Sequence, residues 1–258
     1  MMDDIIKQFG PPMHATPAVR RVERVRHELK RRDLVVIRVE AVGPHFRRIT
    51  FGGESLADFV SASFDDHVKL ILDIGSGAPV MRDYTPRRFD AARRELDIEF
   101  ALHGDGPAAT WAAQATPGQR ATIGGPRGSF IVPTDLAWHV LIGDETALPA
   151  VARRLEELPA GTRAIVRLAV ADPADRRLLA SAADVDLQWV DSDAALLAAV
   201  RALALPAGEG YAWCAGEAGT MAELRRVLVD DKVHDRQAIR AAAYWKRGAV
   251  AHHENLDG

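Results

Sequence analysis

The chain has 258 residues, of which 48% are hydrophobic and 27% charged, and its formal net charge is −3. This composition is typical of a globular protein and argues against a nucleic-acid binder that relies on bulk positive charge. A single cysteine, Cys214, excludes a disulfide framework and a cysteine-ligated iron–sulfur cluster. No apolar run approaches the ~20 residues of a membrane helix, and the acidic, proline-containing start is unlike a secretory signal. We therefore expect a cytoplasmic protein without a membrane span, and a monomer.

The N-terminal half reads as a mobile arm followed by short strands. Residues 1–19 carry several Gly and Pro residues, and residues 20–32 are strongly basic. The basic run is either a solvated strand or helix face, or a basic lip near an anionic ligand. β-Branched and alternating segments then predict strands over 34–42, 46–51, 67–74 and 95–103. Short strands joined by Gly/Pro turns indicate an antiparallel barrel.

The stretch 81–89, MRDYTPRRF, carries side chains that suit a flavin. Tyr84 offers a ring that can stack on an isoalloxazine, and Thr85 adds a hydroxyl beside it. Arg82 and Arg87 offer planar cations for a diphosphate. Because strand side chains alternate, we expect Arg82 and Tyr84 on one face. The alternative is an exposed basic strand end with an ordinary tyrosine.

Residues 104–115 read as a glycine-containing loop that enters a helix. Pro107 suits the first helical turn, and the glycines before it let backbone N–H groups approach a ligand. A helix start binds anions, so a diphosphate is expected here; the alternative is a Gly-Pro turn before a surface helix. The glycine-rich turn 123–130 holds Arg127, either at a hairpin end or at the rim of a phosphate or anionic-substrate site.

The C-terminal half alternates strands and helices. Strands are predicted over 138–144, 164–170, 186–190 and 211–216, and helices over 146–158, 195–205 and 220–230. This alternation implies a parallel sheet with crossover helices, in which ligands bind at the carboxyl ends of the strands. Two such ends carry the residues expected to contact a pyridine nucleotide: Gly143, Asp144, Glu145, Thr146, Gly216 and Glu217.

Several motifs together resemble the siderophore-interacting proteins, a branch of the ferredoxin reductase superfamily. RDYTPRRF is similar to their Arg-x-Tyr-Thr flavin motif, and it is followed in order by HGDGPAATW, GDETALPA, WCAGEA and YWKRG. The resemblance runs from about residue 20 to residue 248. It implies a six-stranded antiparallel Greek-key β-barrel that binds FAD (20–132), a linker (133–137) and a Rossmann-like NAD(P)H-binding α/β domain (138–258).

The resemblance also implies cofactors, a substrate and site residues. The implied FAD contacts are Arg82, Asp83, Tyr84, Thr85, Arg87, His103, Gly104, Gly106, Pro107, Ala108 and Thr110. The implied contacts to an anionic ferric siderophore are Lys69, Arg127, Lys246 and Arg247. NADH or NADPH would supply the electrons, and the flavin would carry them, so no protein acid or base is needed. The segment GDETALP has a single glycine, unlike the glycine-rich fingerprint of most dinucleotide sites.

The predicted activity is that of an FAD-dependent ferric-siderophore reductase. The alternatives are a general NAD(P)H:flavin or quinone reductase of the same fold, and a siderophore carrier without enzymatic activity. Cys214 reads either as a buried hydrophobe or as a neighbour of the nicotinamide. The tail His252-His253-Glu254 reads as solvated, because metal ligands must converge from fixed positions, and no metal site is expected.

Overall fold

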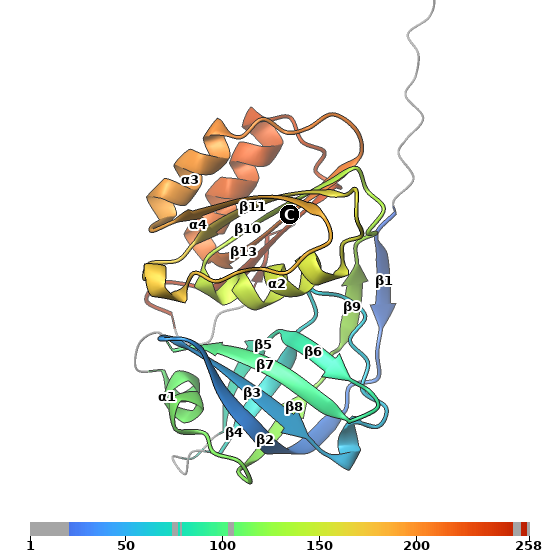
Figure 1. Ribbon diagram of the computed structural model, residues 1–258, viewed down its shortest axis with the longest axis vertical. Helices are drawn as coiled ribbons and strands as arrows, with labels where there is room; N and C mark the ends of the chain where they lie inside the picture. The colour runs from blue at the N-terminus through green and yellow to red at the C-terminus, as the bar shows by residue number, and fades with distance from the viewer. Residues whose placement is uncertain (1–20, 74–76, 78, 103–105, 250–253, 257–258) are drawn as a thin grey trace, which may run out of the picture.

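The computed structural model describes residues 21–73, 77, 79–102, 106–249 and 254–256, which form two lobes (Figure 1). The N-terminal lobe is a curled antiparallel sheet of seven strands in the order β5-β4-β8-β2-β3-β7-β6. The strands are β2 (Arg31–Gly43), β3 (Phe46–Gly52), β4 (Val68–Leu72), β5 (Val80–Tyr84), β6 (Pro86–Asp90), β7 (Glu95–Ala101) and β8 (Arg120–Gly124). The short helix η1 (Glu54–Leu56), the helix α1 (Pro107–Gln114) and a ribbon of β1 (Glu23–Arg26) with β9 (Gly128–Ile131) complete this part.

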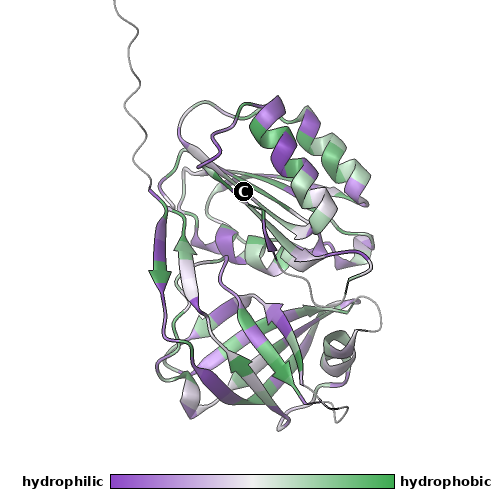
Figure 2. Cartoon of the chain, turned by 180° about the vertical axis from the view of Figure 1, so that it is seen from behind, coloured by the Kyte–Doolittle hydropathy of each residue, from purple (hydrophilic) through white to green (hydrophobic). Residues whose placement is uncertain are grey.

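The two edge strands of this sheet, β5 and β6, are consecutive in the chain and are separated only by Thr85. Alternation decides which side chains enter the core: Val68, Leu70 and Leu72 of β4 are all buried, while the residues between them are half-buried. Figure 2 shows the same alternation of apolar and polar segments along the strands of the curled sheet. The chain therefore reaches both edges of the sheet with one extended segment.

The C-terminal lobe is a six-stranded sheet in the order β12-β11-β10-β13-β14-β15, parallel except for β15. Its strands are β10 (Trp138–Gly143), β11 (Arg163–Ala169), β12 (Asp184–Val190), β13 (Gly210–Glu217), β14 (Ile239–Trp245) and β15 (Glu254–Asn255). Its helical segments are η2 (Glu145–Ala147), α2 (Leu148–Glu157), η3 (Pro173–Asp175), α3 (Asp193–Ala202), α4 (Ala218–Arg226) and η4 (Val227–Asp231). Every residue of β10 and β13 is buried, as expected of central parallel strands.

Helices cover both faces of the parallel sheet. In Figure 1, α2 lies between this sheet and the N-terminal lobe, and α3 and α4 lie on the opposite face. Leu148, Val151 and Leu155 of α2 are fully buried, at the apolar positions that helical spacing predicts. α2 therefore lies at the interface between the two lobes.

One hydrophobic cluster spans both lobes, in addition to a cluster within each lobe. Phe46 and Phe64 come from the N-terminal lobe, yet both are buried in the cluster that contains Leu148 and Trp213. The rings of Phe64 and Trp213 meet edge to face with 5.4 Å between their centroids. Beside them the indole Nε1 of Trp213 donates a 2.9 Å hydrogen bond to the buried carboxylate of Asp65. The interface is thus packed like a domain interior.

The predicted alternation of elements is confirmed, whereas several boundaries differ. The strand predicted from residue 34 begins at Arg31, and the basic run before it is part of β1 and the start of β2. The helix predicted over 195–205 ends at Ala202. Strands β8, β9, β14 and β15 were not predicted. No helix among the described residues is long and apolar enough to cross a membrane, and residues 1–19 lie outside the described part.

Candidate functional site

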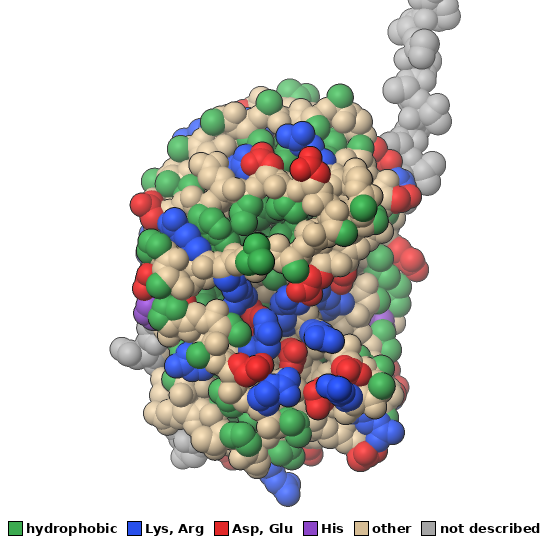
Figure 3. Space-filling model, viewed as in Figure 1, with side chains coloured by type: hydrophobic (Ala, Val, Ile, Leu, Met, Phe, Trp, Pro, Cys, Tyr) green, Lys and Arg blue, Asp and Glu red, His purple; other side chains and the backbone are tan. Residues whose placement is uncertain are grey.

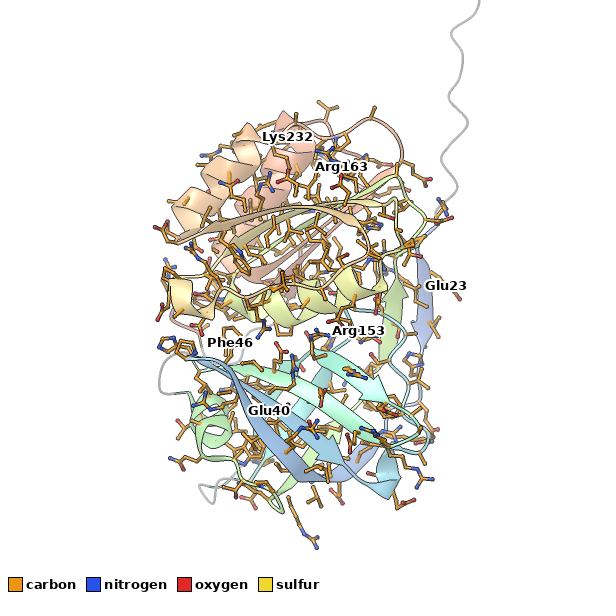
Figure 4. The ribbon with its side chains drawn as sticks, viewed as in Figure 1. Glu23, Glu40, Phe46, Arg153, Arg163 and Lys232 are labelled. Atoms are coloured by element: carbon orange, nitrogen blue, oxygen red, sulfur yellow. The ribbon has the colours of Figure 1, made fainter. Side chains whose placement is uncertain are left out.

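A cleft of about 170 Å³ lies where the two lobes meet. Its residues from the N-terminal lobe are Phe46, Arg82, Asp83, Tyr84, Thr85, Glu99 and Ala101, and those from the C-terminal lobe are Glu145, Thr146, Pro149 and Tyr244. Figure 3 shows basic and acidic side chains gathered across the junction of the two lobes on one face of the molecule. Figure 4 shows Phe46 and Arg153 at this junction, reaching from opposite lobes.

The end of β5 supplies the aromatic side of the cleft. Cross-strand pairing sets Arg82 and Tyr84 opposite the core residues of β4, and Asp83 opposite Lys69, as alternation predicts. Tyr84 packs against Phe100 with 4.4 Å between ring centroids. Burial raises the pKa of Tyr84 to about 12, so its hydroxyl keeps its proton even in alkaline solution and can donate a hydrogen bond.

Thr85, which separates β5 from β6, faces the other lobe. Its hydroxyl is hydrogen-bonded to the side chain of Tyr244, which comes from β14, and burial raises the pKa of Tyr244. This contact joins the predicted flavin motif to the YWKRG segment across the interface. The sequence placed both segments near a cofactor, but it gave no signal that they touch.

Arg87 is engaged in an ion network between the lobes. Its guanidinium donates to both carboxylate oxygens of Glu156 on α2, at 2.8 Å for the Nη1 bond, and this bond lowers the pKa of Glu156. Its Nε lies 3.6 Å from Glu99, whose side chain is completely buried. Glu99 also accepts a 2.6 Å bond from Arg48 and pairs with Arg177 of the C-terminal lobe. Glu99 is a cleft residue that the sequence analysis did not identify.

The segment after β7 leads into α1. Gly106 is the residue before the helix, and Pro107 begins it. No described side chain caps this helix, and a Cβ at Gly106 would meet nothing within 4 Å. Ala108 is buried, whereas the backbone N–H of Thr110 is already bonded to the carbonyl of Gly106. The predicted contacts His103 and Gly104 lie outside the described residues.

Asp144 forms hydrogen bonds to residues at the carboxyl ends of three parallel strands. Its Oδ1 accepts from the backbone and hydroxyl of Thr146, and its Oδ2 accepts from the backbone N–H of Glu217 (3.0 Å) and Nε1 of Trp245 (2.8 Å). Burial raises the pKa of Asp144 to about 6. A Cβ at Gly216, where φ is +152°, would lie 2.5 Å from Oδ2. Asp144 therefore connects the segments that follow β10 and β13 with the end of β14.

Of the other residues predicted to contact the nucleotide, some line the cleft and one caps a helix. Glu217 caps α4 by accepting from the backbone N–H of Thr220 at 3.0 Å, and its other oxygen accepts from that of Arg247. Glu145 and Thr146 line the cleft, and Gly143 ends β10 two residues before Glu145. Cys214 is fully buried in β13, which agrees with its interpretation as a small buried side chain.

The four predicted substrate cations do not line the cleft. Lys69 is paired with Asp83 at 2.7 Å, and Arg247 with Asp193 at 3.2 Å. Arg127 and Lys246 are exposed. Lys69 and Arg127 belong to the N-terminal lobe, whereas Lys246 and Arg247 follow β14 in the other.

Comparison with known proteins places this architecture in a family. Residues 136–248 match the family model "Siderophore-interacting protein", and residues 35–78 and 73–130 match "Siderophore-interacting FAD-binding domain". An Escherichia coli protein named NADPH-dependent ferric-chelate reductase is 36% identical over 255 residues, covering 90% of this chain and 99% of the relative. The chain belongs to the siderophore-interacting protein family.

Solved structures of other siderophore-interacting proteins have the same fold. A siderophore utilization protein from T. fusca superimposes with a TM-score of 0.82 at 33% identity, covering 90% of this chain and 98% of that one. The siderophore-interacting protein SipS from Aeromonas hydrophila gives 0.78 at 33% identity, covering 88% and 94%. A ferric vibriobactin reductase from Vibrio cholerae is 32% identical, over 90% of this chain and 95% of the relative. The ferredoxin reductase of carbazole 1,9a-dioxygenase, at 18% identity and a TM-score of 0.60, shares the fold.

The residues of the cleft fit a flavin. Tyr84 presents an aromatic ring, Arg82 a guanidinium, and Thr85 a hydroxyl, all on the cleft wall. The uncapped start of α1, with open space at Gly106, suits a diphosphate. Arg87 lies apart from this set, because Glu156 and Glu99 already hold its guanidinium.

Proposed function

We propose that this siderophore-interacting protein is an FAD-dependent ferric-siderophore reductase that takes its electrons from NADPH. The observation that carries the proposal is the cleft itself, where the flavin motif of one lobe faces the carboxyl end of the parallel sheet of the other. Relatives from Escherichia coli and Vibrio cholerae carry names of ferric-chelate and ferric vibriobactin reductases. The match to a siderophore-interacting FAD-binding domain supports the cofactor.

We propose that residues 20–132 form the FAD-binding unit, 133–137 the linker and 138–258 the nucleotide-binding unit, preceded by the arm 1–19. We propose that these strands correspond to a six-stranded barrel of Greek-key type, because β5 and β6 are two parts of one extended segment at opposite edges of the sheet. The order β12-β11-β10-β13-β14 corresponds to the 3-2-1-4-5 order of Rossmann-like sheets. We place the protein in the cytoplasm as a monomer.

Flavin binding is assigned to Tyr84, Arg82 and Thr85, and to the start of α1. The ring of Tyr84 would stack on the isoalloxazine, the hydroxyl of Thr85 would lie at its polar edge, and Arg82 and the first N–H groups of α1 would hold the diphosphate. His103, Gly104 and Asp83 remain predicted contacts. When bound there, FAD would supply the electron-transfer chemistry, in which two electrons are taken up together as hydride and given up singly to ferric iron.

The nucleotide is assigned to the edge formed by Gly143, Glu145, Thr146 and Gly216. Asp144 holds these segments at a fixed separation through its four hydrogen bonds, and it orients Trp245. The order of the sheet reverses between β10 and β13, which is where ligands bind in open α/β sheets. The protein's contribution is therefore to position two ligands and to exclude water between them.

Recognition of the ferric chelate is assigned to Lys69, Arg127, Lys246 and Arg247. Exposed cations attract an anionic chelate by long-range charge. Because Lys69 and Arg247 are already ion-paired, a general NADPH:flavin reductase is the second candidate.

Anaerobic absorbance spectroscopy tests the proposal. Purified protein reconstituted with FAD is mixed with NADPH or NADH, then with a ferric siderophore and a ferrous-iron trap. We expect the flavin bands to bleach with NADPH and to recover as ferrous iron appears. Bleaching without ferrous iron favours the general reductase, and a protein that binds the chelate but takes up no FAD is a carrier. Lys246→Ala should slow only the chelate step.

A further inference from the structure

The tip of the β2–β3 hairpin carries a histidine that meets two aspartates of the other lobe. In Figure 1 this tip lies beside the short yellow helical turn η3 at the left of the C-terminal lobe. Nδ1 of His45 lies 2.8 Å from Oδ2 of Asp175 and 3.6 Å from Oδ2 of Asp172. All three ligand atoms lie within 4.8 Å of one another. His45 directly precedes Phe46, the cleft residue labelled in Figure 4.

Backbone N–H groups hold each carboxylate in place. The N–H of His45 donates to Oδ1 of Asp175 at 2.9 Å, and the N–H of Ala174 donates to Oδ1 of Asp172 at 2.9 Å. In each aspartate the other oxygen, Oδ2, is thereby directed toward the imidazole. Bonds of this kind fix the ligands of metal sites and raise their affinity.

Gly43 makes the approach of the two lobes possible. A Cβ on Gly43 would lie 2.5 Å from Oδ1 of Asp175, so any other residue would push this carboxylate away. The side chain of Asp175 is 1% exposed, whereas those of His45 and Asp172 are 46% and 43% exposed. The cluster therefore has one buried ligand and an open side on which water can complete a coordination shell.

We propose that His45, Asp172 and Asp175 bind a divalent first-row transition-metal ion, such as Zn²⁺ or Fe²⁺, and so link the two lobes beside the cleft. One imidazole and two carboxylates form the nitrogen–oxygen set that such ions prefer. Ligand atoms each about 2.1 Å from one ion lie about 3.0–3.4 Å apart, so the two separations from Nδ1 of His45, 2.8 and 3.6 Å, need to change by only a few tenths of an ångström. When the ion binds Nδ1, the neutral imidazole takes the tautomer that carries its proton on Nε2, and both carboxylates bind as anions.

The test measures metal binding without FAD or NADPH, so it is independent of the proposed reductase activity. Metal-free protein is titrated with Zn²⁺ by calorimetry, and with Co²⁺ by visible absorption. All proteins carry His252→Ala and His253→Ala, so that the adjacent histidines of the tail add nothing to the measured binding. We expect one equivalent of Zn²⁺ and a Co²⁺ spectrum typical of nitrogen and oxygen ligands.

Asp172→Asn is the decisive variant. Its side-chain oxygen still accepts from the N–H of Ala174, so η3 is retained while the charged ligand is lost. We expect an affinity about 10- to 100-fold lower. Asp191→Asn, a change at an exposed aspartate, is the control and should bind as tightly as the parent. Failure of the parent to bind, or equal affinity of the two variants, would overturn the proposal. Gly43→Ala should weaken binding as well, by displacing Asp175.

Discussion

Replacing Glu99 with glutamine should destabilise the protein, because Glu99 is the buried counter-charge for arginines of both lobes. Its side chain is 0% exposed, while those of Arg48, Arg87 and Arg177 are 31%, 9% and 18% exposed. Removing one partner of a fully buried ion pair costs about 3–5 kcal/mol. The three arginines retain some contact with water, which offsets part of this cost. We therefore expect the free energy of unfolding to fall by about 2–3 kcal/mol.

Urea denaturation followed by circular dichroism measures this loss, and a thermal scan should show a midpoint lower by about 4–10 °C. Glu40→Gln is the matched control. Glu40 pairs with Arg38 at 3.3 Å, but both side chains are nearly half exposed on β2, where Figure 4 labels Glu40. Such a pair contributes less than about 1 kcal/mol. Equal effects of the two substitutions would refute the idea that Glu99 acts as a buried charge.

Three further predictions concern the proposed nucleotide site and the proposed flavin site. Because the folded-state pKa of Asp144 is about 6 rather than 3.8, its contribution to stability should fall as pH rises from about 4 to about 6, by about 3 kcal/mol, and then stay constant. This contribution is measured as the difference in unfolding free energy between wild type and Asp144→Asn across this pH range. A difference that does not change with pH would contradict the prediction. Gly216→Ala should cost about 2–4 kcal/mol in urea denaturation, because its Cβ meets Asp144, whereas Gly106→Ala should leave stability unchanged. Tyr84→Ala should weaken FAD binding about tenfold in a fluorescence titration, through the loss of stacking; unchanged affinity would remove Tyr84 from the flavin site.

Local sequence patterns predicted the elements that carry the site. Alternation in 81–89 put Arg82 and Tyr84 on one face, and the register of β5 with β4 agrees. The alternation of strands and helices after residue 138 gave a parallel sheet, and the structure has one. These features depend on neighbours within a few residues, which is why the sequence alone contains them.

Contacts between distant segments could not be predicted in this way. Glu99 reads as one residue of a strand, and its role depends on the register that sets it opposite Arg48 and on docking that brings Arg177 to it. The contact between Thr85 and Tyr244 likewise exists only because the lobes meet. Asp144 was predicted to contact a nucleotide, while its hydrogen bonds show a bracing role that arises from three separate segments.

The shared core has a consequence for engineering the protein. Phe46 and Phe64 pack among buried side chains of the C-terminal lobe. A fragment beginning near residue 138 would expose the apolar side chains that these two rings cover. Removing one large apolar side chain from a core lowers the free energy of unfolding by about 3–5 kcal/mol. We therefore expect that the C-terminal lobe does not fold as an independent fragment. A chimera that exchanges this lobe for the lobe of another reductase must also exchange the two segments that carry Phe46 and Phe64.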